Sequence, residues 1–194
     1  MNMFKKIITA AILAATTVGC GGCAAEVTGL ETAEPVSPIT WTECSYEQGD
    51  HACDLTLTDQ NGEIWNLYNN HGKVIILDFS TMWCGYCQVA AAEVREVQEK
   101  YGDDIVYVTV LVEDQAGNVP DINDLDTWAS VFGITNAPVL GGDRSLIKSA
   151  DNDGWEVTGW PAFYFLTDDL VIHTSLRGFS STAIDSLIQD TIAQ

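Results

Sequence analysis

The stretch DFSTMWCGYCQVAAAEV, residues 78–94, decides how the chain folds and what chemistry it offers. Two cysteines, Cys84 and Cys87, are separated by two residues and follow shortly after the apolar run KVIILDF. A continuous apolar run is typical of a strand that is buried on both faces. After Cys84, apolar residues recur at helical spacing as far as Tyr101, and Gly102 is expected to end the helix. The pattern therefore predicts a strand, a turn that carries the two cysteines, and a helix.

The start of the predicted helix is a favourable place for a reactive thiol. Unpaired backbone N–H groups at a helix start favour negative charge, so the thiol of Cys84 is biased towards the nucleophilic thiolate. Cys87 lies one turn further on and is expected to point inward, and Gly85 allows the tight turn between them. The spacing predicts unequal partners: an exposed attacking cysteine and a more buried resolving cysteine.

The rest of the chain alternates between strand and helix patterns. DLTLTDQNGEIWNL indicates a hairpin that turns at Asn61–Gly62, and PAFYFLT and LVIHTSL indicate a second hairpin around Asp168 and Asp169. DIVYVTVLV and APVLGG are typical of strands, and DINDLDTWASVFGI is typical of a helix. STAIDSLIQDTIAQ predicts a final helix with Thr182 as its cap and Asp185 three residues on. This order indicates an α/β fold with a mixed sheet whose parallel strands are joined by right-handed crossovers.

Two motifs in this frame resemble the thioredoxin fold. WCGYC follows a strand and opens a helix, and WEVTGWPAFYFLTDD resembles the second thioredoxin signature, in which Pro161 takes the place of a cis-proline before the penultimate strand. The resemblance runs from about Cys53 to the C-terminus and is strongest to the exported, membrane-tethered branch typified by TlpA and ResA. It implies a three-layer α/β sandwich with a mixed central sheet, an N-terminal β-hairpin and a βα insertion.

The resemblance also implies which residues form the site. Four are expected to carry the chemistry: Cys84, Cys87, Asp78 and Pro161. Four more are expected to contact the partner: Trp83, Gly85, Tyr86 and Trp160. A carboxyl buried in an apolar strand has a raised pKa, so Asp78 is expected to exchange protons with Cys87 through water. The alternative is that Asp78 only caps or solvates the end of its strand.

Two residues depart from the pattern of this branch. Trp160 is bulkier than the Thr or Val that commonly precede the cis-proline, and Tyr86 stands where many relatives have Pro. Residues between and around the cysteines shift the stability of the thiolate and hence the reduction potential. The motif therefore leaves open whether the protein reduces, oxidises or isomerises its partners.

The N-terminus has the layout of a secretory signal. Two lysines precede an apolar stretch from Ile7 to Val18, and TVGC resembles a bacterial lipobox. We expect a signal peptide over 1–19, lipidation at Cys20, a flexible tether over 20–40 and one domain over 41–194. Cleavage near Ala25 and an uncleaved anchor are the alternatives. Lipidation implies the periplasmic side of a bacterial cell envelope, with attachment to the membrane through lipid alone.

Composition and the remaining cysteines agree with an exported protein. The chain has 8 basic and 28 acidic residues among 194, a formal charge of −20, which argues against binding to nucleic acid or to anionic lipid headgroups. Export provides an oxidising compartment, and Cys44 and Cys53 fit a local disulfide across the turn-forming residues Gly49 and Asp50. Cys23 is left over, either free or joining two molecules.

Competing interpretations of the cysteine pair fit the sequence less well. Zinc needs more ligands than this pair supplies, and an inert bridge is disfavoured because so short a bridge at a helix start is reducible. A peroxiredoxin-like thiol peroxidase would match Thr81 in a T-x-x-C spacing, but Leu77 stands where those enzymes have Pro. An SCO-like copper chaperone, a non-enzyme, would use His173 as a third ligand but has C-x-x-x-C spacing.

The sequence therefore predicts a protein thiol–disulfide oxidoreductase. Its redox group would be the Cys84–Cys87 disulfide itself, with no separate cofactor and no metal. Its partners would be protein thiols or disulfides of the cell envelope, and a membrane electron donor is compatible with this function.

Overall fold

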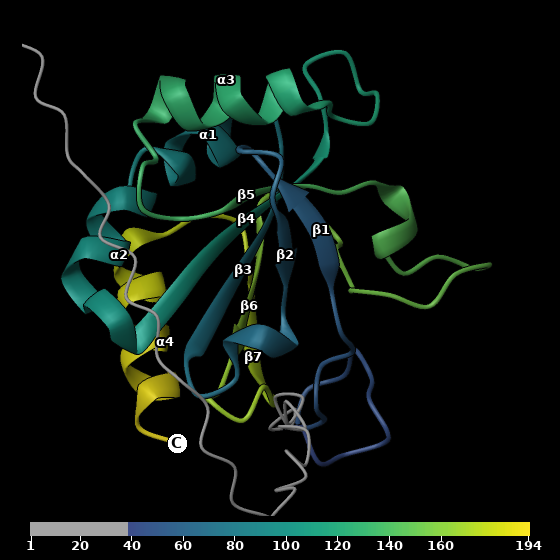
Figure 1. Cartoon of the computed structure of the whole chain (residues 1–194), viewed down its shortest axis with the longest axis vertical. Helices are drawn as coiled ribbons and strands as arrows, with labels where there is room; N and C mark the ends of the chain where they lie inside the picture. The colour runs from purple at the N-terminus through teal and green to yellow at the C-terminus, as the bar shows by residue number, and fades with distance from the viewer. Residues whose placement is uncertain (1–38) are drawn as a thin grey trace, which may run out of the picture. The chain divides into compact units, whose positions relative to one another are not determined.

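A seven-stranded mixed sheet organises residues 39–194, which are the residues that this computed structural model describes (Figure 1). The predicted signal peptide, the predicted lipidation site Cys20 and the remaining cysteine Cys23 lie outside the described residues. The strands are β1 (Thr56–Asp59), β2 (Ile64–Asn66), β3 (Val74–Thr81), β4 (Ile105–Glu113), β5 (Val139–Gly141), β6 (Ala162–Leu166) and β7 (Ile172–Arg177). The helices are α1 (Gly85–Ala91), α2 (Val94–Tyr101), α3 (Ile122–Phe132) and α4 (Ser181–Ile192), with short 3₁₀ turns η1 (Tyr68–Asn70), η2 (Gly102–Asp104) and η3 (Arg144–Leu146).

The strand order is β2-β1-β5-β4-β3-β6-β7. β3 pairs in parallel with β4, and β4 with β5, whereas β6 and β7 form an antiparallel hairpin beside β3. The N-terminal hairpin β1–β2 is present, and its turn uses Gly62 with φ of +79°, as the Asn-Gly signal predicts. The helix α3 and the strand β5 lie between β4 and the last hairpin, where the insertion is predicted. The mixed α/β sheet, both hairpins and the insertion are thus confirmed.

The two faces of the sheet are covered differently. All four helices pack against the core that contains Val74 and Ile76 of β3, and we call this side the helical face. The opposite side, the loop face, contains Ile75, Leu77 and Phe79, and it is covered by residues 39–55 and 142–161, which contain no α-helix (Figure 1). The third layer of the predicted sandwich therefore consists of irregular chain. Because β3 is covered on both sides, all eight of its residues are buried.

The helix after the cysteines differs from its prediction. It is divided into α1 and α2, because the N–H of Glu93 bonds to the carbonyl of Ala90, three residues back, at 3.0 Å. Val89, one of the apolar residues that recur at helical spacing after Cys84, lies on α1 and is 52% exposed, so it is not on the buried face of the helix that this pattern predicts. Gly102 ends α2 with φ of +58°, as expected.

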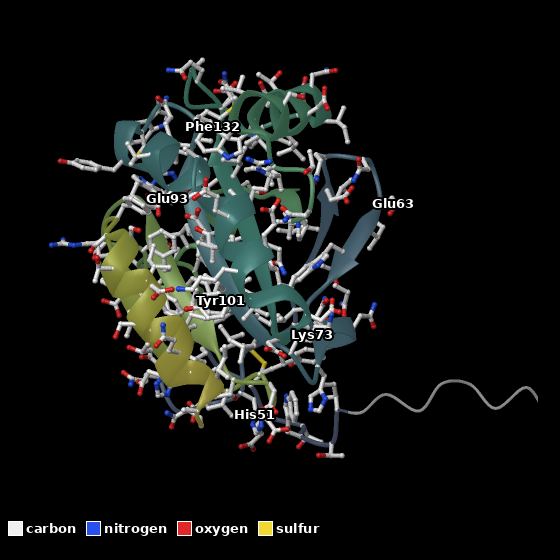
Figure 2. The ribbon with its side chains drawn as sticks, turned by 90° about the vertical axis from the view of Figure 1, so that its left-hand side faces the viewer. His51, Glu63, Lys73, Glu93, Tyr101 and Phe132 are labelled. Atoms are coloured by element: carbon white, nitrogen blue, oxygen red, sulfur yellow. A yellow bond between two sulfur atoms is a disulfide. The ribbon has the colours of Figure 1, made fainter. Side chains whose placement is uncertain are left out.

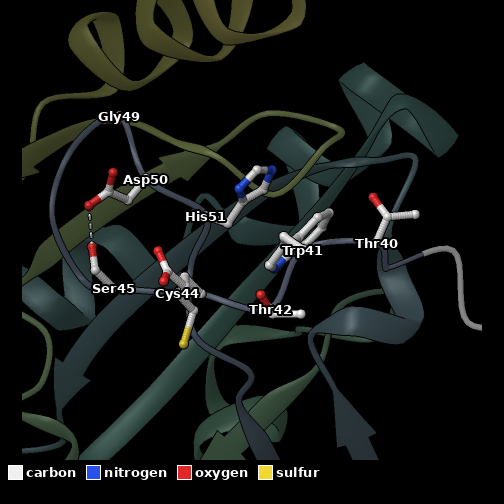
Figure 3. A pocket seen from close by; sticks show the side chains of 9 residues that line it. Thr40, Trp41, Thr42, Cys44, Ser45, Gly49, Asp50 and His51 are labelled. Atoms are coloured by element: carbon white, nitrogen blue, oxygen red, sulfur yellow. Dashed lines mark hydrogen bonds between the residues drawn. The ribbon is translucent and has the colours of Figure 1, made fainter.

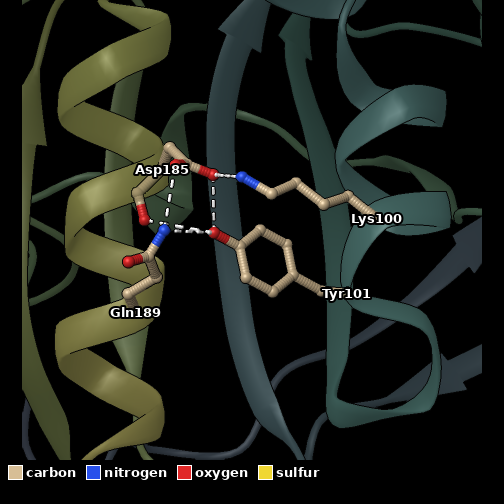
Figure 4. Close-up of polar contacts among 4 residues, drawn as sticks. All are labelled: Lys100, Tyr101, Asp185 and Gln189. Carbon is tan, nitrogen blue, oxygen red and sulfur yellow. Dashed lines mark hydrogen bonds and ion pairs between the residues drawn. The ribbon is translucent and has the colours of Figure 1, made fainter.

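The cap of the last helix was also assigned wrongly. Ser180, not Thr182, caps α4 by accepting a hydrogen bond from the N–H of Ala183. Asp185 is therefore not part of a capping box. Its carboxylate instead bonds to the Lys100 ammonium and, at 2.6 Å, to the Tyr101 hydroxyl of α2, as Figure 4 shows. Gln189 donates to the same carboxylate at 3.0 Å, so this network joins α2 to α4.

Cys44 and Cys53 form the predicted disulfide. Figure 2 shows it near His51, at the opposite end of the domain from Phe132 of α3. The loop that it closes is also held by hydrogen bonds, among them the N–H of Gly49 to the carbonyl of Ile172 at 2.8 Å. A pocket beside this loop has Trp41 stacked on His51 with ring centroids 3.9 Å apart (Figure 3). Among the described residues, no helix is long and apolar enough to cross a membrane.

Replacing this disulfide with Cys44→Ser/Cys53→Ser should lower the free energy of unfolding. The bridge joins residues nine positions apart, and closing so short a loop restricts the unfolded chain by about 2–3 kcal/mol. Urea denaturation followed by circular dichroism measures the effect, with Cys84→Ser/Cys87→Ser as a control that leaves the bridge intact. An unchanged unfolding midpoint would show that the bridge does not stabilise the domain.

Candidate active site

The cysteine pair lies where β3 passes into α1, at the carboxyl end of the central strand. Cys84 is the N-cap of α1, with an extended backbone, and its sulfur accepts a hydrogen bond from the N–H of Cys87 at 3.2 Å. Both cysteines are free thiols. Cys84 is 8% exposed and Cys87 is fully buried, so the outer and inner positions are as predicted, although Cys84 is far less exposed than expected. An incoming sulfur therefore has access to Cys84 alone.

The turn before the cysteines is held by three hydrogen bonds. The N–H of Met82 donates to the carbonyl of Glu113 at 3.0 Å, and the N–H of Cys84 donates to the carbonyl of Thr81 at 3.3 Å. The side-chain amide of Gln88 reaches back from α1 to the carbonyl of Met82 at 2.8 Å. Sequence reasoning did not identify Gln88. Its contact fixes the turn against the first turn of the helix.

The surroundings of Cys87 oppose its ionisation. Burial raises the pKa of the Cys87 thiol well above its ordinary value, and the neighbouring Cys84 and the charge of Asp78 raise that pKa further. The backbone of Thr81 and, to a smaller extent, the hydroxyl of Ser80 lower the same pKa, but burial has the largest effect. Because the thiolate is the reactive form, Cys87 needs a nearby group to take its proton.

Asp78 is the buried carboxyl that the sequence predicts. It lies within β3, paired with Thr109 on one side and Phe163 on the other, and it is fully buried. Burial raises its pKa from 3.8 to about 7, although hydrogen bonds from the Ser80 hydroxyl at 2.7 Å and the Tyr107 hydroxyl at 3.3 Å lower it. This position argues against the alternative in which Asp78 caps or solvates the strand end. Sequence patterns do not identify Ser80 and Tyr107 as neighbours of Asp78, because neither residue belongs to a motif.

The peptide bond between Trp160 and Pro161 is cis. Phe79 of β3 pairs with Ala162 of β6, so Pro161 lies at the level of Ser80, next to the end of the strand that leads to the cysteines. The carbonyl of Pro161 accepts a hydrogen bond from the N–H of Gly178 at 2.7 Å. Trp160 is partly buried and packs against the same core cluster as Cys84 and Cys87. The fold therefore brings the second motif to the cysteine pair.

Exposed aromatic side chains flank Cys84 in the sequence. Tyr86 is 70% exposed and Trp83 is 43% exposed, and Gly85 between the cysteines is also exposed. Exposed aromatic side chains next to a buried reactive group are typical of a protein-docking surface. Val89, one turn further along α1, extends this apolar surface.

Two further residues belong to the site and lack a sequence signal. The indole N–H of Trp83 donates to the Glu113 carboxylate at 2.8 Å, and the Arg144 guanidinium binds the same carboxylate at 2.6–2.7 Å. Glu113 follows Trp83 by 30 residues and Arg144 follows Glu113 by 31. Only the β3–β4 pairing and the return of the chain after β5 bring them together.

The structure also shows the surroundings of the residues on which the copper-chaperone and peroxidase interpretations depend. His173 lies on β7 with its Nε2 2.9 Å from a carboxylate oxygen of Asp190 on α4, which gives this histidine a structural partner. Thr81 has a buried hydroxyl for which the described part of the chain provides no hydrogen-bond partner. No three His, Cys, Asp or Glu side chains between residues 39 and 194 are grouped so as to hold a metal ion.

Comparison with known proteins agrees with this geometry. The AhpC/TSA family model matches residues 48–173. The thioredoxin-like protein YneN of Bacillus subtilis (strain 168) is 25% identical over 130 residues, which cover 67% of this chain and 71% of that protein.

Two solved structures share the fold. A putative thiol:disulfide interchange protein DsbE from Chlorobium tepidum has a TM-score of 0.60 at 22% identity, over 77% of this chain and 98% of its own. An exposed lipoprotein thioredoxin from Streptococcus pneumoniae strain TIGR4 has a TM-score of 0.58 at 24% identity, over 71% of this chain and 99% of its own. The family match covers more than half of the chain, so the chain belongs to the AhpC/TSA family and is a thioredoxin-like protein thiol–disulfide oxidoreductase.

Proposed function

We propose that the protein exchanges a Cys84–Cys87 disulfide with cysteines of partner proteins on the periplasmic side of a bacterial cell envelope, where lipid on Cys20 tethers it to a membrane. The observation that carries the exchange reaction is the unequal pair, with Cys84 at the helix start and Cys87 buried behind it near Asp78. The basic, apolar and small-residue order of the N-terminus supports export. The likeness to an exposed lipoprotein thioredoxin agrees with it.

In the reducing direction the reaction has two steps. The thiolate of Cys84 attacks one sulfur of a partner disulfide, so a mixed disulfide forms and the other partner sulfur leaves as a thiolate. The thiolate of Cys87 then attacks the sulfur of Cys84, which forms the Cys84–Cys87 disulfide and releases the second partner sulfur. Two electrons pass from the pair to the partner, and a membrane electron donor would restore the dithiol. Oxidation of partners is the same sequence in reverse, and neither direction needs a separate cofactor.

Asp78 would take the proton that Cys87 must lose in the second step. Its raised pKa, about 7, places it close to half-ionised at neutral pH, where an acid can both accept and return a proton. The negative charge of Asp78 raises the pKa of the Cys87 thiol, so the carboxyl lies close enough to influence the ionisation of that thiol. Pro161 would leave the backbone before it free to pair with an extended segment of the partner, next to the surface of Trp83, Gly85, Tyr86 and Trp160.

Serine substitutions should separate the roles of the two cysteines. Cys84→Ser should abolish turnover in an insulin-reduction assay with dithiothreitol, because no attacking sulfur remains. Cys87→Ser should accumulate the mixed disulfide with insulin, detected by mass spectrometry and reversed by excess dithiothreitol. An active Cys84→Ser protein together with a Cys87→Ser protein that traps nothing would reverse the assignment.

Asp78→Asn should slow the second step at neutral pH and should change how stability depends on pH. Since burial raises the pKa of the folded carboxyl above its unfolded value of 3.8, the folded state holds this proton more tightly. The wild-type protein therefore loses stability as pH rises from about 4 through 7, by at most about 4 kcal/mol. Urea denaturation of the reduced proteins should show Asp78→Asn to be more stable at pH 8, with the difference closing near pH 4. Parallel stability curves would contradict a raised pKa.

Lipidation can be tested on the full-length chain in a Gram-negative host given a radioactive fatty acid. Cys20→Ala should abolish labelling and release the protein from the membrane fraction, because lipid on that sulfur is the proposed tether. Cys23→Ala is the matched control, and this variant should keep both the fatty-acid label and its attachment to the membrane fraction. Labelling that persists in Cys20→Ala would contradict the proposed site.

A further inference from the structure

Glu113 connects the two tryptophans of the site. One carboxylate oxygen accepts the indole N–H of Trp83 at 2.8 Å, and the other accepts the Arg144 guanidinium at 2.6 Å and 2.7 Å. The same guanidinium lies over the ring of Trp160, 5.5 Å from its centroid. Trp83 directly precedes Cys84 and Trp160 directly precedes Pro161. A single chain of contacts, Trp83–Glu113–Arg144–Trp160, therefore joins both motifs.

A shift in strand register accompanies this arrangement of Glu113. Ser80 pairs with Leu111, but Thr81 pairs with Glu113, so β4 carries one extra residue at this point. Such bulges change the direction of side chains next to active sites. Glu113 is only 13% exposed at its side chain, so the carboxylate needs a compensating partner, and Arg144 provides it. Arg144 keeps 60% of its own side chain exposed, which makes the pair accessible at the edge of the docking surface.

The backbone that carries Arg144 is itself fixed. The carboxylate of Asp143 accepts the N–H of Ser145 at 2.6 Å and so caps η3. The N–H of Gly142 bonds to the carbonyl of Leu111 at 2.8 Å, which attaches this turn to β4. The amide of Asn152 donates to the carbonyl of Ser145 at 2.5 Å. Arg144 therefore extends from a rigid turn towards Glu113 and Trp160.

We propose that the Glu113–Arg144 pair is a positioning device that holds Trp83 and Trp160 as the two walls of the partner-docking surface. The inference rests on the proposed exchange with protein partners and assigns the pair to recognition, with the thiol chemistry left to Cys84 and Cys87. Immobilising a large side chain on binding costs free energy, and side chains that are already held avoid that cost. A partner protein that contacts both walls therefore binds more tightly, whereas a disulfide too small to reach the walls gains no affinity from them.

The test compares a protein disulfide with a small one. Arg144→Gln removes the charge and the flat group over Trp160, and we expect KM for insulin to rise about tenfold, with a smaller change in kcat. For 2-hydroxyethyl disulfide, which is too small to span the two walls, we expect a much smaller change in KM. The ratio of the two kcat/KM values should therefore fall about tenfold. Lys148→Gln is the matched control, because it breaks an ion pair with Glu47, and neither of these residues belongs to the Trp83–Glu113–Arg144–Trp160 chain of contacts.

Two further variants keep the test decisive if Arg144→Gln folds poorly. Glu113→Gln retains an acceptor for Trp83 but releases Arg144, and Arg144→Lys retains the charge but loses the flat guanidinium. Both should lower the same ratio, and combining Glu113→Gln with Arg144→Gln should cost less than the sum of the two.

An unchanged ratio, or an equal loss for both substrates, would overturn the positioning role and leave the pair as a purely structural contact. A wild-type protein that reduces neither substrate would instead contradict the proposed function.

Discussion

The burial of β3 on both faces is the constraint on which the rest of the structure depends. The strand lies between β4 and β6, and all eight of its residues are buried. Apolar side chains account for most of this burial and stabilise the domain by removing that surface from water. The strand can end only where the covering layers end, and there the chain turns out through Met82 and Trp83 into α1. The two thiols are thus placed just beyond the end of a strand that is buried along its whole length.

Burial of the Asp78 carboxyl within β3 lowers the stability of the folded protein, but the same burial supports the proposed proton transfer. Asp78 receives hydrogen bonds from Ser80 and Tyr107, yet burial still dominates and raises its pKa to about 7. An apolar residue at the same position would avoid this penalty. The penalty and the proposed proton transfer have the same physical cause, which is the low polarity around Asp78 and Cys87. Activity and stability are therefore opposed at this one position.

The contacts around Glu113 show how irregular chain contributes to the site. Residues 142–161 cover part of the loop face without an α-helix. This segment carries Arg144 to Glu113 and Trp160 to the core cluster that contains the cysteines. Its conformation is held by the cap at Asp143, by the amide of Asn152 and by the burial of Trp155 in the core. A segment without an α-helix can thus be held in place when its backbone polar groups are satisfied.

Local spacing, turn residues and apolar runs were enough to predict the strand, the cysteine turn, both hairpins and the Cys44–Cys53 bridge. They left two positions open for Asp78, and only the structure shows that it is buried within β3. It misplaced the cap of α4 and missed the break after Ala91, where one hydrogen bond over three residues redirects the helix. Only the tertiary structure shows that the Glu113 carboxylate binds both the Trp83 indole and the Arg144 guanidinium. Glu113 follows Trp83 by 30 positions, and Arg144 follows Glu113 by 31. Only the pairing of β3 with β4, the bulge beside Ser80 and the return of the chain after β5 bring these three residues within hydrogen-bonding distance.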